Sequence, residues 1–203
     1  MSAPAPSTWP RRRERTIAAR KRRSTLPARR RAPPPRIEIV VASPRWNAKR
    51  SARAALRRAI AAAAAAVSLA DGELAVVLTD DAAMRTLNRA WRSKDTPTNV
   101  LSFPAEGNAP VRNLRTPGAR QTRPRPRLLG DIVIAYETAD REARAERKPF
   151  SHHLAHLAVH GFLHLAGYDH EADDEADVME RLESAILARL DVPDPYLARS
   201  AGG

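Results

Sequence analysis

The segment K-P-F-S-H-H-L-A-H-L-A-V-H-G-F-L-H-L-A-G, residues 148–167, has a helical pattern that constrains the fold more than any other part of the chain. Pro149 suits the first turn of a helix, and Gly167 suits the turn that ends one. Four histidines follow the spacing i, i+3, i+7 and i+11 and so share one helical face: His153, His156, His160 and His164. Four larger apolar side chains remain for burial: Leu154, Leu157, Phe162 and Leu165. The segment therefore predicts a helix at 149–166 that packs on a core and presents a stripe of histidines.

Strand-like and helix-like patterns alternate through the rest of the chain. Runs rich in β-branched or other apolar residues predict strands at 36–41, 72–79, 97–104 and 129–135. Helical periodicity and propensity predict helices at 47–67, at 137–147, at 172–190, and from a cap at Thr79 or Asp80 through Met84, Leu87 and Trp91. Together these elements predict an α/β (α+β) fold, a single domain in which a small mixed sheet of about four strands is layered with helices.

The positive charge of the chain is concentrated at its beginning. Residues 1–36 hold 12 of the 35 Lys and Arg residues and one of the 23 acids, so the remaining 23 basic and 22 acidic residues leave a net charge of only +1. This Arg- and Pro-rich extension predicts disorder, and the folded domain is expected at 37–198. Three origins of the extension stay open: a coding bias or misplaced start, a polybasic arm for RNA, or an organelle-targeting peptide. Residues 105–127 are also rich in Pro and Arg and predict a mobile basic loop.

Composition excludes several classes of protein. The chain has no cysteine, so it forms no disulfide and any metal must use histidine, carboxylate or water. The longest hydrophobic run, A-I-A-A-A-A-A-A-V at 59–67, is too short and too weakly apolar to span a bilayer. We therefore expect a soluble protein that has no membrane partner.

Three of the histidines have the spacing of metal ligands. His160 and His164 lie one helical turn apart, and His170 follows a glycine turn that would return the chain over them. A single histidine would more often be an ordinary core or surface residue, but the three together predict a metal site on a helix and its following loop. Three imidazoles leave a coordination position open to water, as in catalytic rather than structural zinc sites. His153 and His156 are weaker ligand candidates and are expected either to contact the ligands or to support the structure.

The spacing H-x-x-x-H-x-x-G-x-x-H is also that of the metzincin proteases. Those enzymes carry a glutamate directly after the first histidine, where it acts as the base. Here that position is Gly161, so a peptidase is disfavoured.

The segment H-G-F-L-H-L-A-G-Y-D-H closely resembles the signature of the bacterial YbeY endoribonucleases, also called rRNA maturation factors. The resemblance extends to L-N-R-A-W-R-S-K-D-T-P-T-N-V-L-S-F-P at 87–104, L-G-D-I-V-I at 129–134 and D-D-E-A-D-V-M-E-R-L-E at 173–183. It implies one Zn²⁺ ion held by His160, His164 and His170, and hydrolysis of single-stranded RNA. It further implies a cytoplasmic role in 16S rRNA 3′-end maturation and ribosome quality control, with the small ribosomal subunit or its assembly proteins as partners.

The same resemblance assigns a catalytic role to Arg92, whose guanidinium offers a forked donor to a phosphate; an exposed arginine at a helix end is the alternative. Asp169 and Glu171 flank His170 and either orient a ligand, accept a proton, or are solvated acids. Asp131 either supports the site from a strand or forms a turn hydrogen bond. The sequence does not identify the general base.

Three functions remain open: a zinc-dependent endoribonuclease, a ribosome-assembly factor with a mainly structural zinc, and a metal-dependent hydrolase of another bond. The chain has only three each of Phe, Trp and Tyr, so no base-stacking platform is evident. We expect contacts to the RNA backbone to dominate, with the extension and the basic loop as possible additional contacts.

Overall fold

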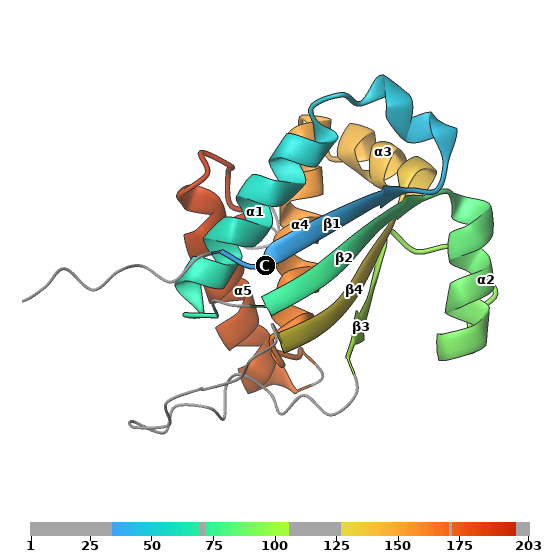
Figure 1. Ribbon diagram of the computed structural model, residues 1–203. Coiled ribbons are helices and arrows are strands. Elements are labelled where there is room, and N and C mark those ends of the chain that lie inside the picture. Colours follow the sequence, from blue (N-terminus) through green and yellow to red (C-terminus); the bar gives the residue numbers. More distant parts are fainter. Residues whose placement is uncertain (1–33, 70–71, 106–126, 171, 198–203) are drawn as a thin grey trace, which may run out of the picture. The chain divides into compact units, whose positions relative to one another are not determined.

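The computed structural model describes residues 34–69, 72–105, 127–170 and 172–197. Its elements follow the order β1 (Arg36–Val41), the 3-10 helix η1 (Pro44–Ala48), α1 (Ala52–Ala66), β2 (Gly72–Thr79), α2 (Asp81–Arg92), β3 (Val100–Pro104), β4 (Arg127–Ala135), α3 (Tyr136–Ala145), α4 (Phe150–Leu165) and α5 (Asp173–Ala188). The described part thus holds the four strands and the helices that the sequence patterns predict (Figure 1). The expected extension lies outside it except for residues 34–36, and so does the expected basic loop except for its end residues, 105 and 127.

The four strands form one mixed sheet in the order β1-β2-β4-β3. The pairs β1–β2 and β2–β4 are parallel, with Val41 opposite Leu78 and Leu78 opposite Ile134. The pair β3–β4 is antiparallel, with Val100 opposite Ile134. The short strand β3 is therefore one edge of the sheet. The predicted mixed sheet is confirmed.

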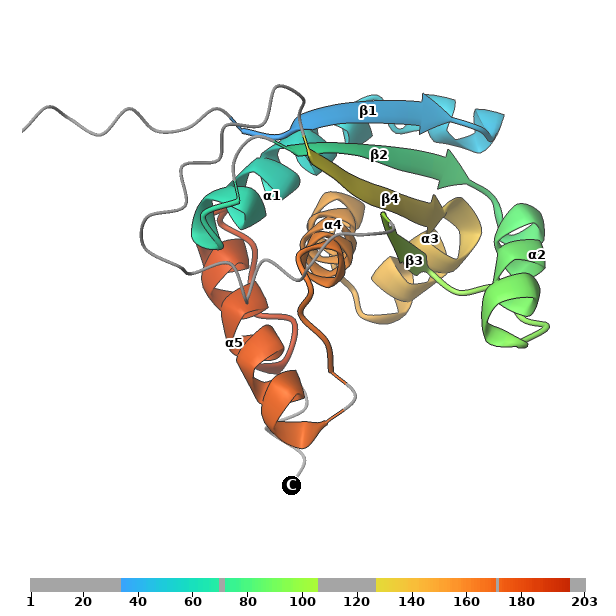
Figure 2. The same cartoon turned by 60° about the horizontal axis from the view of Figure 1, so that its bottom comes forward.

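The larger hydrophobic core lies on one face of the sheet, beneath α1 and α4 (Figure 2). Alternate strand residues point to this face because successive side chains of a strand point to opposite sides. They are Val76 and Leu78 of β2 and Ile132 and Ile134 of β4, all fully buried or nearly so. The helices contribute Leu56 and Ile60 from α1, and Leu154 and Phe162 from α4.

Helix α4 approaches the β3–β4 edge very closely at Gly161. A Cβ atom at this position would lie 2.9 Å from Cγ2 of Ile132 and 3.1 Å from Oγ of Ser102. The Ser102 hydroxyl donates a hydrogen bond of 3.2 Å to the carbonyl oxygen of Gly161. Glycine therefore lets the helix backbone rest on the sheet, and this contact sets the position of the histidine stripe relative to β3.

Helix α2 covers the opposite face of the sheet near β3. Asp80 caps it by accepting a hydrogen bond of 3.0 Å from the backbone N–H of Ala83, as the sequence predicts. Met84 is fully buried in a smaller core with Leu101 of β3 and Val133 of β4, and Leu87 packs against them. This packing brings the last turn of α2, which contains Trp91 and Arg92, next to strand β3.

The structure corrects several predicted boundaries. The helices expected to end at 147 and 190 end at Ala145 and Ala188, and three elements begin two or more residues from the expected position. The helix expected at 47–67 begins at Ala52, because Pro44 starts a separate 3-10 helix before it. In this 3-10 helix the buried Trp46 donates a hydrogen bond to the carbonyl oxygen of Thr79. Strand β3 begins at residue 100 rather than 97, where the Asn99 side chain accepts a hydrogen bond from the backbone N–H of Val100. Strand β4 begins two residues earlier than expected, at 127. Within the described ranges, no helix has both the length and the apolar character needed to cross a membrane.

Candidate metal centre

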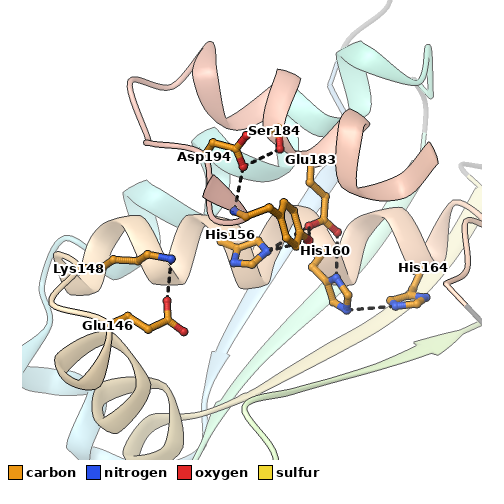
Figure 3. Close-up of polar contacts among 9 residues, drawn as sticks. Glu146, Lys148, His156, His160, His164, Glu183, Ser184 and Asp194 are labelled. Atoms are coloured by element: carbon orange, nitrogen blue, oxygen red, sulfur yellow. Dashed lines mark hydrogen bonds and ion pairs between the residues drawn. The ribbon is translucent and has the colours of Figure 1, made fainter. Parts of the chain in front are cut away.

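His160, His164 and His170 converge at the C-terminal end of α4. The two helix histidines lie one turn apart, and their Nε2 atoms are separated by 3.2 Å (Figure 3). The ring of His170 lies 5.4 Å from that of His160 and 5.0 Å from that of His164, measured between centroids. One nitrogen from each of the three rings lies within 4.8 Å of the other two. The three residues singled out in the sequence thus form one cluster.

His170 reaches the cluster because the chain turns back directly after α4. Gly167 has a φ of +87°, in the left-handed region that glycine adopts most readily. The backbone N–H of Tyr168 donates to the carbonyl oxygen of Leu163 at 3.0 Å, which fixes the turn. The Asp169 carboxylate then accepts a hydrogen bond of 2.8 Å from the backbone N–H of His170.

The donor set fits a metal ion such as zinc. Two nitrogens that bind one tetrahedral zinc at about 2.0–2.1 Å are about 3.3 Å apart, and the Nε2 atoms of His160 and His164 are separated by 3.2 Å. Burial, followed by the neighbouring His160 and His170, lowers the pKa of His164 to about 4. His164 is therefore neutral at pH 7, and a neutral imidazole is the form that binds a metal.

A buried carboxylate contacts two of the histidines of α4 and supports the cluster. Glu183 of α5 is 0% exposed, and its two oxygens lie 2.9 Å from Nδ1 of His160 and 3.0 Å from Nε2 of His156. The Tyr196 hydroxyl donates a further hydrogen bond to Glu183. Burial would raise the pKa of Glu183, but the hydrogen bonds to His156 and His160 outweigh it and hold the pKa at about 2. Since an ionised carboxylate only accepts, His160 donates through Nδ1 and keeps Nε2 for a ligand bond.

His153 belongs to a different cluster. It is buried, its Nε2 lies 3.0 Å from Glu142 of α3, and Glu142 also accepts a hydrogen bond of 2.8 Å from the Asn99 side chain. This network ties α3 and α4 to the start of β3. The contacts of His153 and His156 agree with the supporting roles expected of them.

Two cavities adjoin the histidine cluster. The larger, about 630 Å³, is lined by Ser102 and Pro104 of β3, by His164 and His170, by the turn residues 167–169, and by Arg92 and Lys94 from the end of α2. The smaller, about 330 Å³, lies toward α5 and is lined in part by His156, His160, His170, Glu183 and Tyr196. His170 borders both, so the cluster is accessible from two sides.

The two cations in the larger cavity differ from the other cations of α2. Arg85 and Arg89 both form ion pairs with Asp95, at 2.6 and 3.8 Å. Neither Arg92 nor Lys94 pairs with a carboxylate among the residues that the structure describes. Arg92 therefore lies in the same cavity as two of the histidines, with its guanidinium available to an anion.

Of the three acids that the sequence offers as candidates for the site, Asp169 and Asp131 line different cavities. Asp169 lines the larger cavity, with an oxygen 4.0 Å from Nδ1 of His164. Glu171 lies outside the described residues. Asp131 does not support the histidine cluster, because alternation along β4 places it on the face opposite Ile132. It lines a separate cavity of about 720 Å³, to which all four strands contribute.

Glu183 and Tyr196 were not predicted as site residues. The chain between His160 and Glu183 includes a turn and most of α5, so spacing alone does not indicate their contact. One signal was present: Glu183 shares a helical face with Met179, Ile186 and Leu187, which are all buried. An acid on the apolar face of a helix indicates a buried carboxylate that has polar partners.

The fold and these side chains define a single-domain α/β protein with a three-histidine candidate metal site on a helix and its following turn. The sequence model of the family described as "Endoribonuclease YbeY" matches residues 41–191. An endoribonuclease YbeY from Rhodopseudomonas palustris (strain BisA53) is 57% identical over 80% of this chain and 91% of its own. One from Bradyrhizobium diazoefficiens is 54% identical over 81% and 87%. The chain therefore belongs to the endoribonuclease YbeY family. Among solved structures, it is similar to the solution structure of TM1509 from Thermotoga maritima, with 21% identity, a TM-score of 0.45, and coverage of 76% of this chain and 91% of that one.

Proposed function

We propose that this protein is a metal-dependent endoribonuclease that cleaves single-stranded RNA with one zinc ion held by His160, His164 and His170. The observation that carries the proposal is the shared cavity: two histidines of the cluster and two cations line the same space of about 630 Å³, and among the described residues neither cation has an ion-pair partner. The relatives reported above carry the name endoribonuclease, which supports RNA as the substrate class.

Each part of the site has a role in phosphodiester hydrolysis. A zinc ion at three imidazoles would activate water and polarise a phosphate oxygen. Arg92 donates paired hydrogen bonds to a phosphate and compensates its charge, and Lys94 adds a second positive charge nearby. Glu183 fixes the orientation of His160 through Nδ1. Asp169, the one carboxylate among the described residues that line this cavity, accepts the proton that the attacking water releases.

The biological role in the proposal follows the family. We propose that the protein acts in the cytoplasm on the 3′ end of 16S rRNA, during maturation and quality control of the small ribosomal subunit. The membership in the family and the two cations in the cavity of the histidines support this role, since rRNA presents many closely spaced phosphates.

The structure weighs against a peptidase. The position that holds the base in the metzincins is Gly161, where even a Cβ atom would lie 2.9 Å from Ile132. A glutamate side chain has no room there. An assembly factor with a mainly structural zinc is disfavoured because the three histidines border two cavities and leave coordination open to a substrate.

The proposal is tested by removing and restoring the metal. Chelator-treated protein should leave a single-stranded RNA intact, one equivalent of zinc should restore cleavage, and the same RNA annealed to its complement should be spared. Equal cleavage before and after chelation would contradict a metal-dependent nuclease. Restored cleavage of a peptide but not of RNA would favour the hydrolase of another bond.

A further inference from the structure

Trp91 is the most exposed large hydrophobic side chain among the described residues, at 71%. It stands in the last turn of α2, directly before Arg92. Burying an aromatic side chain of this size would be favourable, since these rings dominate the energetics of cores and interfaces. An isolated exposed hydrophobic residue is common on protein surfaces, so the surroundings of this one decide whether it has a role.

The indole of Trp91 is held by a second aromatic ring. Its centroid lies 5.5 Å from that of Phe103 in β3, with an angle of 63° between the planes. This edge-to-face contact orients the indole while leaving most of its surface in solvent. Trp91 is therefore an exposed ring with a supported position.

The supported ring lies at the β3 edge of the sheet, on the face opposite the histidine cluster. Phe103 points to that opposite face, because its neighbours Ser102 and Pro104 line the cavity of the histidines and side chains alternate along a strand. Arg92, the residue after Trp91, lines that cavity. The aromatic surface is thus joined to the histidine cavity through Arg92 at the edge of the sheet, where two cations have no ion-pair partner among the described residues.

We propose that Trp91 stacks on an unpaired nucleobase of the RNA strand whose phosphates contact Arg92 and Lys94. This inference rests on the proposed nuclease function and adds the residue that receives a base. Charge complementarity selects the partner: a polyanion with flat apolar faces matches adjacent cations and an exposed indole, and each base stacked on an aromatic side chain contributes noticeably to affinity. This base contact would be added to the backbone contacts that the sequence analysis expects to dominate.

The stacking residue also favours single strands. A base within a duplex is covered on both faces by its neighbours, so it must be unstacked before it can contact Trp91. An unpaired base is available without that cost. Trp91 thereby contributes to selection of unpaired RNA, while Arg92 and Lys94 recognise the phosphates that both forms share.

The test compares two strands of equal length and charge, one a single-stranded RNA and the other a fully abasic ribose-phosphate strand. Binding is measured with the full-length wild type and with Trp91→Ala, Trp91→Phe and Val40→Ala. Val40 is a suitable control because it is an exposed apolar residue of β1, at the opposite edge of the sheet. Thermal unfolding of each variant verifies the fold.

We expect Trp91→Ala to bind the RNA about tenfold more weakly and the abasic strand as the wild type does, whereas Trp91→Phe keeps affinity within about threefold. Bound RNA should quench tryptophan emission in the wild type more than in Trp91→Phe. Equal affinity of wild type and Trp91→Ala for the RNA would overturn the inference. An equal loss of affinity for the RNA and for the abasic strand in Trp91→Ala, or a wild type that binds neither strand, would overturn it as well. A wild type that binds RNA through Trp91 without cutting it would overturn the nuclease function alone.

Discussion

Two of the histidine–carboxylate contacts of helix α4, one in each half of the helix, share the same chemistry and differ in their surroundings. In its first half, His153 contacts Glu142, and the other ring nitrogen of His153 is buried and has no hydrogen-bond partner within the part of the chain that the structure describes. In its second half, His160 contacts Glu183, and the other ring nitrogen faces His164 across 3.2 Å. The carboxylate orients the imidazole in both cases. Only the second contact leaves a nitrogen directed at further ligands, so only that one can serve a metal.

The largest expected difference between the two halves of α4 appears when His160 or His153 is replaced by alanine. His160→Ala should purify without stoichiometric zinc, because two imidazoles remain. His153→Ala should keep its zinc but unfold more easily, since Glu142 loses a buried partner at a cost of about 1–3 kcal/mol. Metal content by mass spectrometry and thermal unfolding give the two readouts. Loss of zinc from folded His153→Ala would remove the distinction between the halves of α4.

Exchange of each carboxylate for its amide should produce a smaller difference of the same kind. Glu183→Gln weakens the hydrogen bond that orients His160, so zinc affinity should fall about 10- to 100-fold. Glu142→Gln is the matched control and should leave zinc affinity unchanged. Competition with a chromophoric chelator at constant pH measures both. Tyr196→Phe, which removes one hydrogen bond to Glu183, should lower zinc affinity by a smaller factor. Equal affinities in both amide variants would show that Glu183 does not act on the metal site.

In the larger cavity, the role of the cations in RNA binding should be separable from the role of the histidines in metal binding. Arg92→Ala should weaken RNA binding by about tenfold and reduce the dependence of log K on log salt by about one unit. Its zinc content should stay that of the wild type. Arg85→Ala is the control on the same helix, because Arg85 is already paired with Asp95. If both arginine variants had the same effect, the cavity would have no specific role in phosphate binding.

The smallest expected effect concerns the stability of the fold at acidic pH. Burial would raise the pKa of Glu142, but the hydrogen bonds from His153 and Asn99 outweigh it and leave the pKa below its usual value. The ionised carboxylate therefore stabilises the fold above the ordinary carboxyl pKa, and this contribution is lost as the pH falls through the lowered value. The melting temperature of the wild type should accordingly drop more between pH 7 and pH 3 than that of Glu142→Gln. Parallel curves would show that this pair contributes no pH-dependent stability.

The local patterns of the sequence were sufficient for the secondary structure and for the three histidines. Strand β2 and the Asp80 cap of α2 follow from short-range rules, because alternation and capping involve neighbouring residues. The approach of His170 follows from the glycine turn directly after α4. Each of these features depends on residues that lie within a few positions of one another.

The parts that the sequence left open depend on packing between distant segments. Glu183 meets His160 only because α5 packs against α4. Trp91 contacts Phe103, which lies in β3, beyond the connection that follows α2. Asp131, a candidate by sequence, lies on the opposite face of the sheet because side chains alternate along β4. Composition and spacing do not determine which of several acids or aromatic residues is brought to the histidines.

The proposed function depends on whether His160, His164 and His170 form a catalytic metal site. The most direct measurement is the cleavage of a single-stranded RNA spanning a 16S rRNA 3′ end by wild type and His164→Ala, purified identically and with metal content determined on both. We expect the wild type to carry about one metal ion and to cut the RNA, and the variant to lose both properties while remaining folded. Equal cleavage by the two proteins would assign the activity to a contaminant and contradict the account.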